Sequence, residues 1–183
     1  MYSHTETVFN TGLSLVAACD VVEQKYHAGI QKSCVVISEF LSENSDALVQ
    51  VSQNAALIEL LFNKLKDELT HLILKESGIL FTCIRKKCRN ATKNNCSCLD
   101  SKVVESIFKT HQIIINITQK LRFLLNNYHV IGNTTSKWND CVNEFFQLEN
   151  MILQWIHVEQ NFLYPTITFH QDISSQLNGR SNG

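Results

Sequence analysis

Two glutamates, Glu76 and Glu159, lie on the apolar faces of two predicted helices and introduce similar endings. Ser-Gly-Ile-Leu-Phe follows Glu76, and Gln-Asn-Phe-Leu-Tyr-Pro follows Glu159. Carboxylates are seldom buried without a partner, because a buried carboxylate loses its hydration. A repeated helix that turns a carboxylate toward the core therefore predicts paired metal ligands.

Two histidines complete this set. His27 and His111 occupy the inward stripes of two further predicted helices, so each of four helices contributes one ionisable residue. Two imidazoles and two carboxylates from facing helices are typical of a carboxylate-bridged dinuclear iron or manganese site. Histidine supplies a neutral nitrogen, and a carboxylate can bridge two cations. The alternative is that each residue is a buried polar group with its own hydrogen-bond partner.

Four amphipathic segments must position these residues. We expect helices over about 8–41, 52–87, 101–127 and 137–163, the third capped by Asp100 or Ser101. The predicted inward stripes, one per helix in chain order, are His27, Ile30, Cys34, Ile37 and Leu41; Leu65, Leu69, Leu72, Glu76, Ile79 and Cys83; Val104, Phe108, His111, Ile115, Thr118, Leu121 and Leu125; and Leu148, Ile152, Trp155, Glu159 and Phe162. Long helices joined by short loops favour an all-α, antiparallel four-helix bundle. We expect residues 1–168 to form the bundle and 169–183 to be a flexible polar tail.

Composition excludes several function classes. The 183 residues carry a formal net charge of -1, whereas a nucleic-acid surface is normally strongly basic. No apolar stretch approaches the roughly 20 residues of a membrane-spanning helix. The sequence shows no nucleophile–base pair and no phosphate-binding glycine loop, so it assigns no enzyme class. We expect no nucleic-acid or membrane partner, and either a monomer or a homodimer.

Seven cysteines raise the question of the redox compartment. Their odd number, and an N-terminus without a basic segment before an apolar core, favour a reduced, cytoplasmic chain. Four N-x-[ST] sequons and the cysteine count favour instead a secreted helical cytokine-like protein. A zinc ion or cluster on four clustered cysteines is a further alternative, although their spacing matches no common zinc finger. These cysteines are Cys83, Cys88, Cys96 and Cys98.

The sequence resembles the hemerythrin-like proteins, and most closely the di-iron iron–sulfur cluster repair proteins, over about residues 17–168. The segments that carry the resemblance are Tyr26-His27, Asp67-Glu68-Leu69-Thr70, Lys75-Glu76, Ile79-Leu80-Phe81, Thr110-His111 and Ile156-His157-Val158-Glu159-Gln160-Asn161-Phe162-Leu163-Tyr164-Pro165. The last segment is the most specific. The resemblance implies a hemerythrin-like bundle with a dinuclear iron centre on His27, Glu76, His111 and Glu159. It also implies a role in restoring clusters damaged by nitric oxide or oxidants. The implied partners are damaged iron–sulfur proteins, with nitric oxide or dioxygen as small ligands.

The chain departs from this family at two ligand positions. The family carries a histidine four residues before each glutamate, where this chain has Leu72 and Trp155. His71 and His157 are nearby, but a one-residue step is about 100° around a helix, so we expect both on polar faces. Neither can replace a missing ligand without a helix bulge.

Three smaller departures from the family pattern also put the metal chemistry in doubt. Ser77 replaces a second glutamate, Thr82 replaces a proline, and the bulky Ile115 follows one turn after His111. Two hypotheses remain: a retained but weakened metal site, or a metal-free descendant that acts as a binding or scaffold module. In the metal-free case, the glutamates must be protonated or paired with the histidines.

Overall fold

The computed structural model describes residues 13–43, 54–89, 101–129 and 136–165, and its regular structure is helical throughout these ranges. The first rod consists of α2 (Leu15–Val21), a π-helical turn η1 (Val22–His27) and α3 (Ala28–Glu43). The second consists of α5 (Ala55–Lys75), η2 (Glu76–Phe81) and α6 (Thr82–Arg89). The third is α7 (Ser101–Leu124), followed by the short 3-10 turn η4 (Asn126–Tyr128). The fourth is α8 (Ser136–Val158) with the π-helical turn η5 (Glu159–Leu163).

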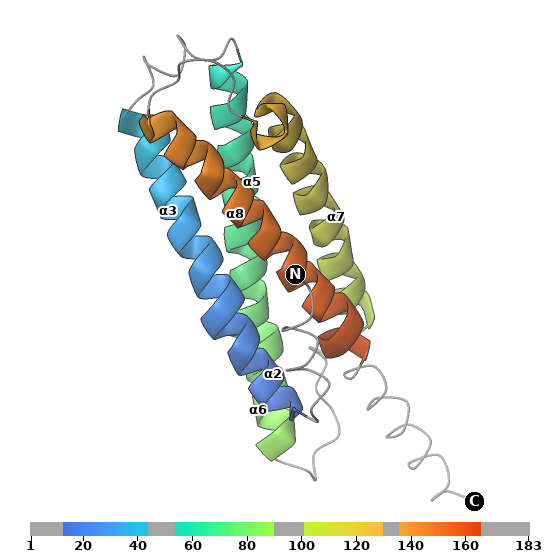
Figure 1. Ribbon diagram of the computed structural model, residues 1–183. Helices are drawn as coiled ribbons and strands as arrows, with labels where there is room; N and C mark the ends of the chain where they lie inside the picture. The colour runs from blue at the N-terminus through green and yellow to red at the C-terminus, as the bar shows by residue number, and fades with distance from the viewer. Residues whose placement is uncertain (1–12, 44–53, 90–100, 130–135, 166–183) are drawn as a thin grey trace, which may run out of the picture.

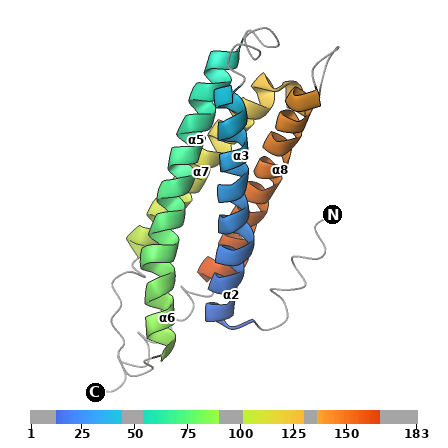
Figure 2. The ribbon, with the colours of Figure 1, turned by 90° about the vertical axis from the view of Figure 1, so that its left-hand side faces the viewer.

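The four rods run up, down, up and down along one bundle (Figure 1). The first rod packs most extensively against the fourth through α3 and α8, and the second against the third through α5 and α7. Figure 2 shows the first two rods side by side, with α2 and α6 at the same end of the bundle. The predicted all-α class is confirmed in the described residues, and the order of the rods is antiparallel.

The helix ends follow local chemistry. The side chain of Ser14 accepts a hydrogen bond from the Ala17 backbone N–H and caps α2. The third helix ends at Leu124 rather than at the predicted Asn127, because Asn126, Asn127 and Tyr128 adopt positive φ angles of 51°, 53° and 64°. Such left-handed residues cannot continue a right-handed helix. The predicted starts at Val8 and Ser52, the cap at Asp100 and the tail 169–183 lie outside the described residues.

The π-helical turns change which residues face the core. Ile79 was predicted to face inward but is 56% exposed, while Leu80 and Phe81 are fully buried. In η5, Phe162 is only half-buried and Leu163 is buried. A π turn inserts extra backbone before the helix returns to the same face, so the inward position moves later in the sequence. The period of a regular α-helix therefore predicts the wrong residue after each glutamate.

Polar clusters connect the rods at both ends of the bundle. On α6, the Arg85 guanidinium donates hydrogen bonds to Asp20 and Glu23 of the first rod. At the other end, Arg122 of α7 donates to the Glu149 carboxylate on α8. The Tyr128 hydroxyl also donates to Glu149, over 2.7 Å. These contacts fix the rods at both ends and leave the region between them to the apolar core.

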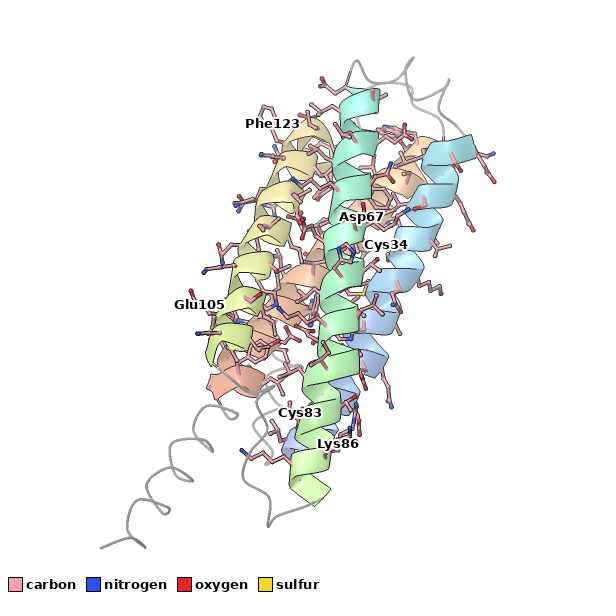
Figure 3. The ribbon with its side chains drawn as sticks, turned by 180° about the vertical axis from the view of Figure 1, so that it is seen from behind. Cys34, Asp67, Cys83, Lys86, Glu105 and Phe123 are labelled. Carbon is pink, nitrogen blue, oxygen red and sulfur yellow. The ribbon has the colours of Figure 1, made fainter. Side chains whose placement is uncertain are left out.

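Side chains on the outer faces separate clearly from the core. Figure 3 shows Glu105 and Phe123 on the outer side of α7 and Asp67 on α5. Phe123 is 78% exposed, and Glu105 pairs on the surface with Lys109 one turn later. None of the described helices has the length and apolarity required to cross a membrane.

Candidate metal centre

The four sequence-predicted ligands lie inside the bundle, one on each rod. His27 ends η1, Glu76 begins η2, His111 lies in the middle of α7 and Glu159 begins η5. His27 is 3% exposed, and the other three residues are completely buried. The prediction that all four face the core is therefore confirmed.

Their donor atoms converge in two linked pairs. His27 Nε2 lies 3.1 Å from Glu76 Oε2, and His111 Nε2 lies 3.1 Å from Glu159 Oε2. Donor atoms of His27, Glu76 and Glu159 all lie within 4.8 Å of one another. Among the described residues, these three form the one histidine–carboxylate group compact enough to hold an ion, and His111 joins it through Glu159.

Three of the four residues stand at a π-helical turn. Such turns are uncommon, and single π turns inside α-helices occur frequently at functional sites. Each turn widens the helix locally and changes the direction of the side chains that follow. In this bundle, the turn η5 brings Tyr164 back toward Glu159, five residues earlier in the chain. The π turns therefore carry site residues and also determine which later side chains face the site.

Tyr164 connects the two glutamates directly. Its buried hydroxyl lies 2.8 Å from Glu76 Oε1 and 3.3 Å from Glu159 Oε2, and it donates to these oxygens. Sequence analysis missed this residue, because five residues in an α-helix amount to about 500°, which places Tyr164 roughly 140° away from Glu159. Only the π turn places both side chains in the same site.

Trp155 fills the space between the two histidines. Its indole ring is fully buried and makes edge contacts with His27 at a centroid distance of 5.1 Å and with His111 at 5.9 Å. Leu72 is 2% exposed. Both residues that stand one turn before the glutamates are therefore part of the core. They supply no metal-binding nitrogen.

The buried glutamates hold their protons to unusually high pH. Burial raises the pKa of Glu76 to about 8, and the neighbouring Glu159 raises it further while the His27 contact opposes the rise. Burial likewise raises the pKa of Glu159, to about 7. Contacts with Glu76, the Trp155 indole N–H and the Tyr164 hydroxyl oppose this rise. Burial lowers the pKa of His111 to about 4, so this imidazole is neutral at neutral pH. A neutral imidazole is the form that binds metals.

Three polar atoms at this site have no hydrogen-bond partner in the described part of the chain. They are His111 Nε2, which lies near Glu159 without the geometry of a hydrogen bond, Glu159 Oε1 and the Trp155 indole Nε1. Buried atoms of this kind are rare, because each forfeits its bonds to water. His111 Nε2 and Glu159 Oε1 are good metal-binding atoms, whereas an indole N–H is not. The histidine and carboxylate donor set therefore fits a metal ion.

The remaining histidines near the site point away from it. His71 and His157 are exposed, as their helical positions predicted. His157 Nδ1 contacts the Asn161 side chain at 3.1 Å. Ser77, in place of a second carboxylate, lies 3.1 Å from His27 Nδ1 and orients that ring. Gln160 lies 3.4 Å from His111 Nδ1 in the equivalent position on the other side.

The cysteines differ from the expectation of a fully reduced chain. Cys83 is disulfide-bonded, whereas Cys19, Cys34, Cys88 and Cys141 are free thiols. The expectation that every thiol is free is therefore wrong at Cys83, whereas the compartment stays a prediction. A disulfide-bonded Cys83 also cannot donate a thiolate to the alternative zinc or cluster site. Cys96 and Cys98 lie outside the described residues.

Comparison with known proteins adds no assignment. No protein-family model matches this chain, and no curated protein matches it. The hemerythrin-like resemblance therefore stays a prediction from the sequence.

Proposed function

We propose that this protein binds a transition-metal ion between His27, Glu76, His111 and Glu159. The observation that carries the proposal is the meeting of two buried imidazoles and two buried carboxylates, with His111 Nε2 and Glu159 Oε1 lacking a hydrogen-bond partner among the described residues. A divalent cation would neutralise the carboxylates and satisfy both atoms. No lysine or arginine of the described residues pairs with either glutamate.

Iron is the metal that the family resemblance favours. Imidazole together with carboxylate suits iron, and such an ion supplies one-electron redox chemistry when bound. Four protein donors suffice for one ion. A dinuclear centre, as the family carries, would need ligands from outside the chain because Leu72 and Trp155 supply none. The histidines would serve as terminal nitrogen ligands, and the glutamates as anionic ligands able to bridge.

We further propose, from the resemblance, a role in restoring damaged iron–sulfur proteins in the cytoplasm. An ion with few protein ligands keeps positions for nitric oxide, dioxygen or water, and it can be given up more readily than a fully ligated one. The Cys83 disulfide favours an oxidising compartment instead, so the redox state of this cysteine in the cell tests the cytoplasmic location. Mass spectrometry after thiol alkylation of protein from its native cells distinguishes these two locations.

A metal-free binding module is the second candidate, because several contacts at the site need no ion. Tyr164 donates to both glutamates, and His27 pairs with Glu76. The same pairing, with a proton held by the carboxyls, would stabilise a metal-free core.

Titration with ferrous iron under anaerobic conditions separates the two candidates. We expect wild-type protein to bind at least one iron per chain, and Glu76→Gln and Glu159→Gln variants to lose most of that affinity. Glu149→Gln is the matched control, because Glu149 is also a buried glutamate on a core-facing position but lies in the Arg122 cluster. No binding by the wild-type protein, or equal binding by all four proteins, would reject the metal site and favour the binding module.

A further inference from the structure

The Tyr164 hydroxyl contacts both carboxylates of the candidate metal centre. It lies 2.8 Å from Glu76 Oε1 and 3.3 Å from Glu159 Oε2. Tyr164 is 1% exposed, so water does not compete for these contacts. This oxygen therefore lies beside the carboxylate oxygens that a shared ion would use.

Aromatic neighbours hold the phenol ring in place. Phe108 packs edge-on against it at a centroid distance of 5.5 Å, and His111 lies at 6.4 Å. Both residues belong to α7, which packs against the rod that carries Tyr164. The ring therefore cannot move its hydroxyl away from the glutamates without breaking these aromatic contacts. A pre-positioned donor of this kind loses little entropy when it binds an ion.

We propose that Tyr164 is a fifth ligand of this centre and binds ferric iron as a phenolate. The proposal rests on the metal-binding function proposed above. When ferric iron is supplied, the phenol O–H bond breaks and a bond from the phenolate oxygen to the ion forms. The phenol proton, together with any proton held by the Glu76 and Glu159 carboxyls, leaves to bulk water. No group changes its oxidation state. Together with Glu76 and Glu159, the phenolate would give three anionic oxygens, which balance a trivalent ion.

Three anionic oxygen ligands favour the ferric over the ferrous state of iron. Hard, highly charged cations prefer oxygen donors, and three negative charges offset the charge of a ferric ion in a site that excludes water. Tyr164 would therefore stabilise the oxidised centre, whereas the two neutral histidines alone would not. The consequence is a centre with a lowered reduction potential.

The test is the visible spectrum of protein loaded with ferric nitrilotriacetate. A phenolate bound to ferric iron gives an intense visible charge-transfer band that carboxylate and imidazole ligands do not give. We expect this band in the wild-type protein and its loss in Tyr164→Phe, together with a fall in ferric affinity of more than about 10-fold. Tyr26→Phe is the matched control, because Tyr26 is equally buried but its hydroxyl contacts neither glutamate.

Each outcome decides between the proposals. Iron bound without the band would overturn the role of Tyr164 and leave the metal-binding function intact. A band that survives in Tyr164→Phe but is lost in Tyr26→Phe would also overturn it. If no iron binds in either oxidation state, both proposals fail. Resonance Raman spectra of wild-type protein grown with deuterated tyrosine test the ligand without any variant, so a Tyr164→Phe protein that does not fold leaves the proposal testable.

Discussion

Glu76→Gln should change how the stability of the metal-free protein depends on pH. Glutamine keeps the shape of glutamate and an oxygen that can accept the hydrogen bond from Tyr164. It removes the ionisation of the side chain. The difference between the two proteins therefore isolates the cost of ionising this fully buried carboxyl.

The magnitude follows from the pKa. Burial raises the pKa of Glu76 from 4.5 to about 8, so the folded protein holds this proton more tightly than the unfolded chain. The contribution is fully present below about pH 4.5 and is lost as the pH rises through about 8. One pKa unit corresponds to about 1.4 kcal/mol. Between pH 5 and pH 8, the free energy of unfolding should fall by about 4 kcal/mol more in the wild-type protein than in Glu76→Gln.

Two neighbouring groups also respond to this substitution. Burial lowers the pKa of His111 to about 4, so its contribution has the opposite sign and is lost as the pH falls from 6.5 toward 4. The Glu76 carboxylate opposes this shift and also interacts with Glu159, so the measured difference includes the response of both neighbours.

Urea unfolding in the presence of a chelator, at pH 5, 6.5 and 8, measures the effect. Parallel pH profiles for wild type and Glu76→Gln would refute the reasoning, since they would mean that the buried carboxyl ionises in the folded protein as it does in water.

Three further predictions concern the ion and the scaffold. Ferrous affinity of the wild-type protein should rise from pH 5 to pH 8, because ligand carboxyls must lose their protons, and titrations at several pH values check this. Gly78→Ala should raise the free energy of unfolding by about 0.5–1 kcal/mol, since an added Cβ meets nothing within 4 Å and alanine favours the helix. Glu149→Ala should lower it by about 1–3 kcal/mol, because Arg122 loses its carboxylate partner.

The two stability predictions each have a control within the chain. A Cβ at Gly29 would lie 2.5 Å from Met151 Sδ, so Gly29→Ala should gain less than Gly78→Ala in the same urea unfolding measurement. The exposed Glu105→Ala should change stability by no more than about 0.5 kcal/mol, against the larger loss at Glu149. An iron affinity that does not depend on pH, or equal effects within either mutant pair, would contradict the corresponding prediction.

Much of the fold could be predicted from the sequence, because apolar residues at three- and four-residue steps define the inward face of a regular α-helix. This period placed all four candidate ligands correctly. It failed after each glutamate, where a π turn replaces the regular helix and buries Leu80 instead of Ile79. No residue pattern in one sequence reports such a turn. The contacts of Tyr164 with the two glutamates were missed for the same reason.

The role of Trp155 also needed the structure. The resemblance in the sequence predicted that Trp155 stands where the hemerythrin-like proteins carry a ligand, but not that its ring lies against both histidines. Contacts between rods depend on how all four rods are arranged in space. The spacing of apolar residues along one helix does not predict them. The Cys83 disulfide was missed because cysteine spacing alone does not determine pairing.

The most direct test of the central claim is extended X-ray absorption of protein reconstituted anaerobically with ferrous iron. We predict a ligand shell of mixed nitrogen and oxygen, with scattering from about two imidazoles, that is lost in Glu159→Gln. This result would place the ion at His27, His111 and the buried glutamates. A shell of oxygen alone, or one containing sulfur, would show that iron binds elsewhere and would contradict the proposed centre.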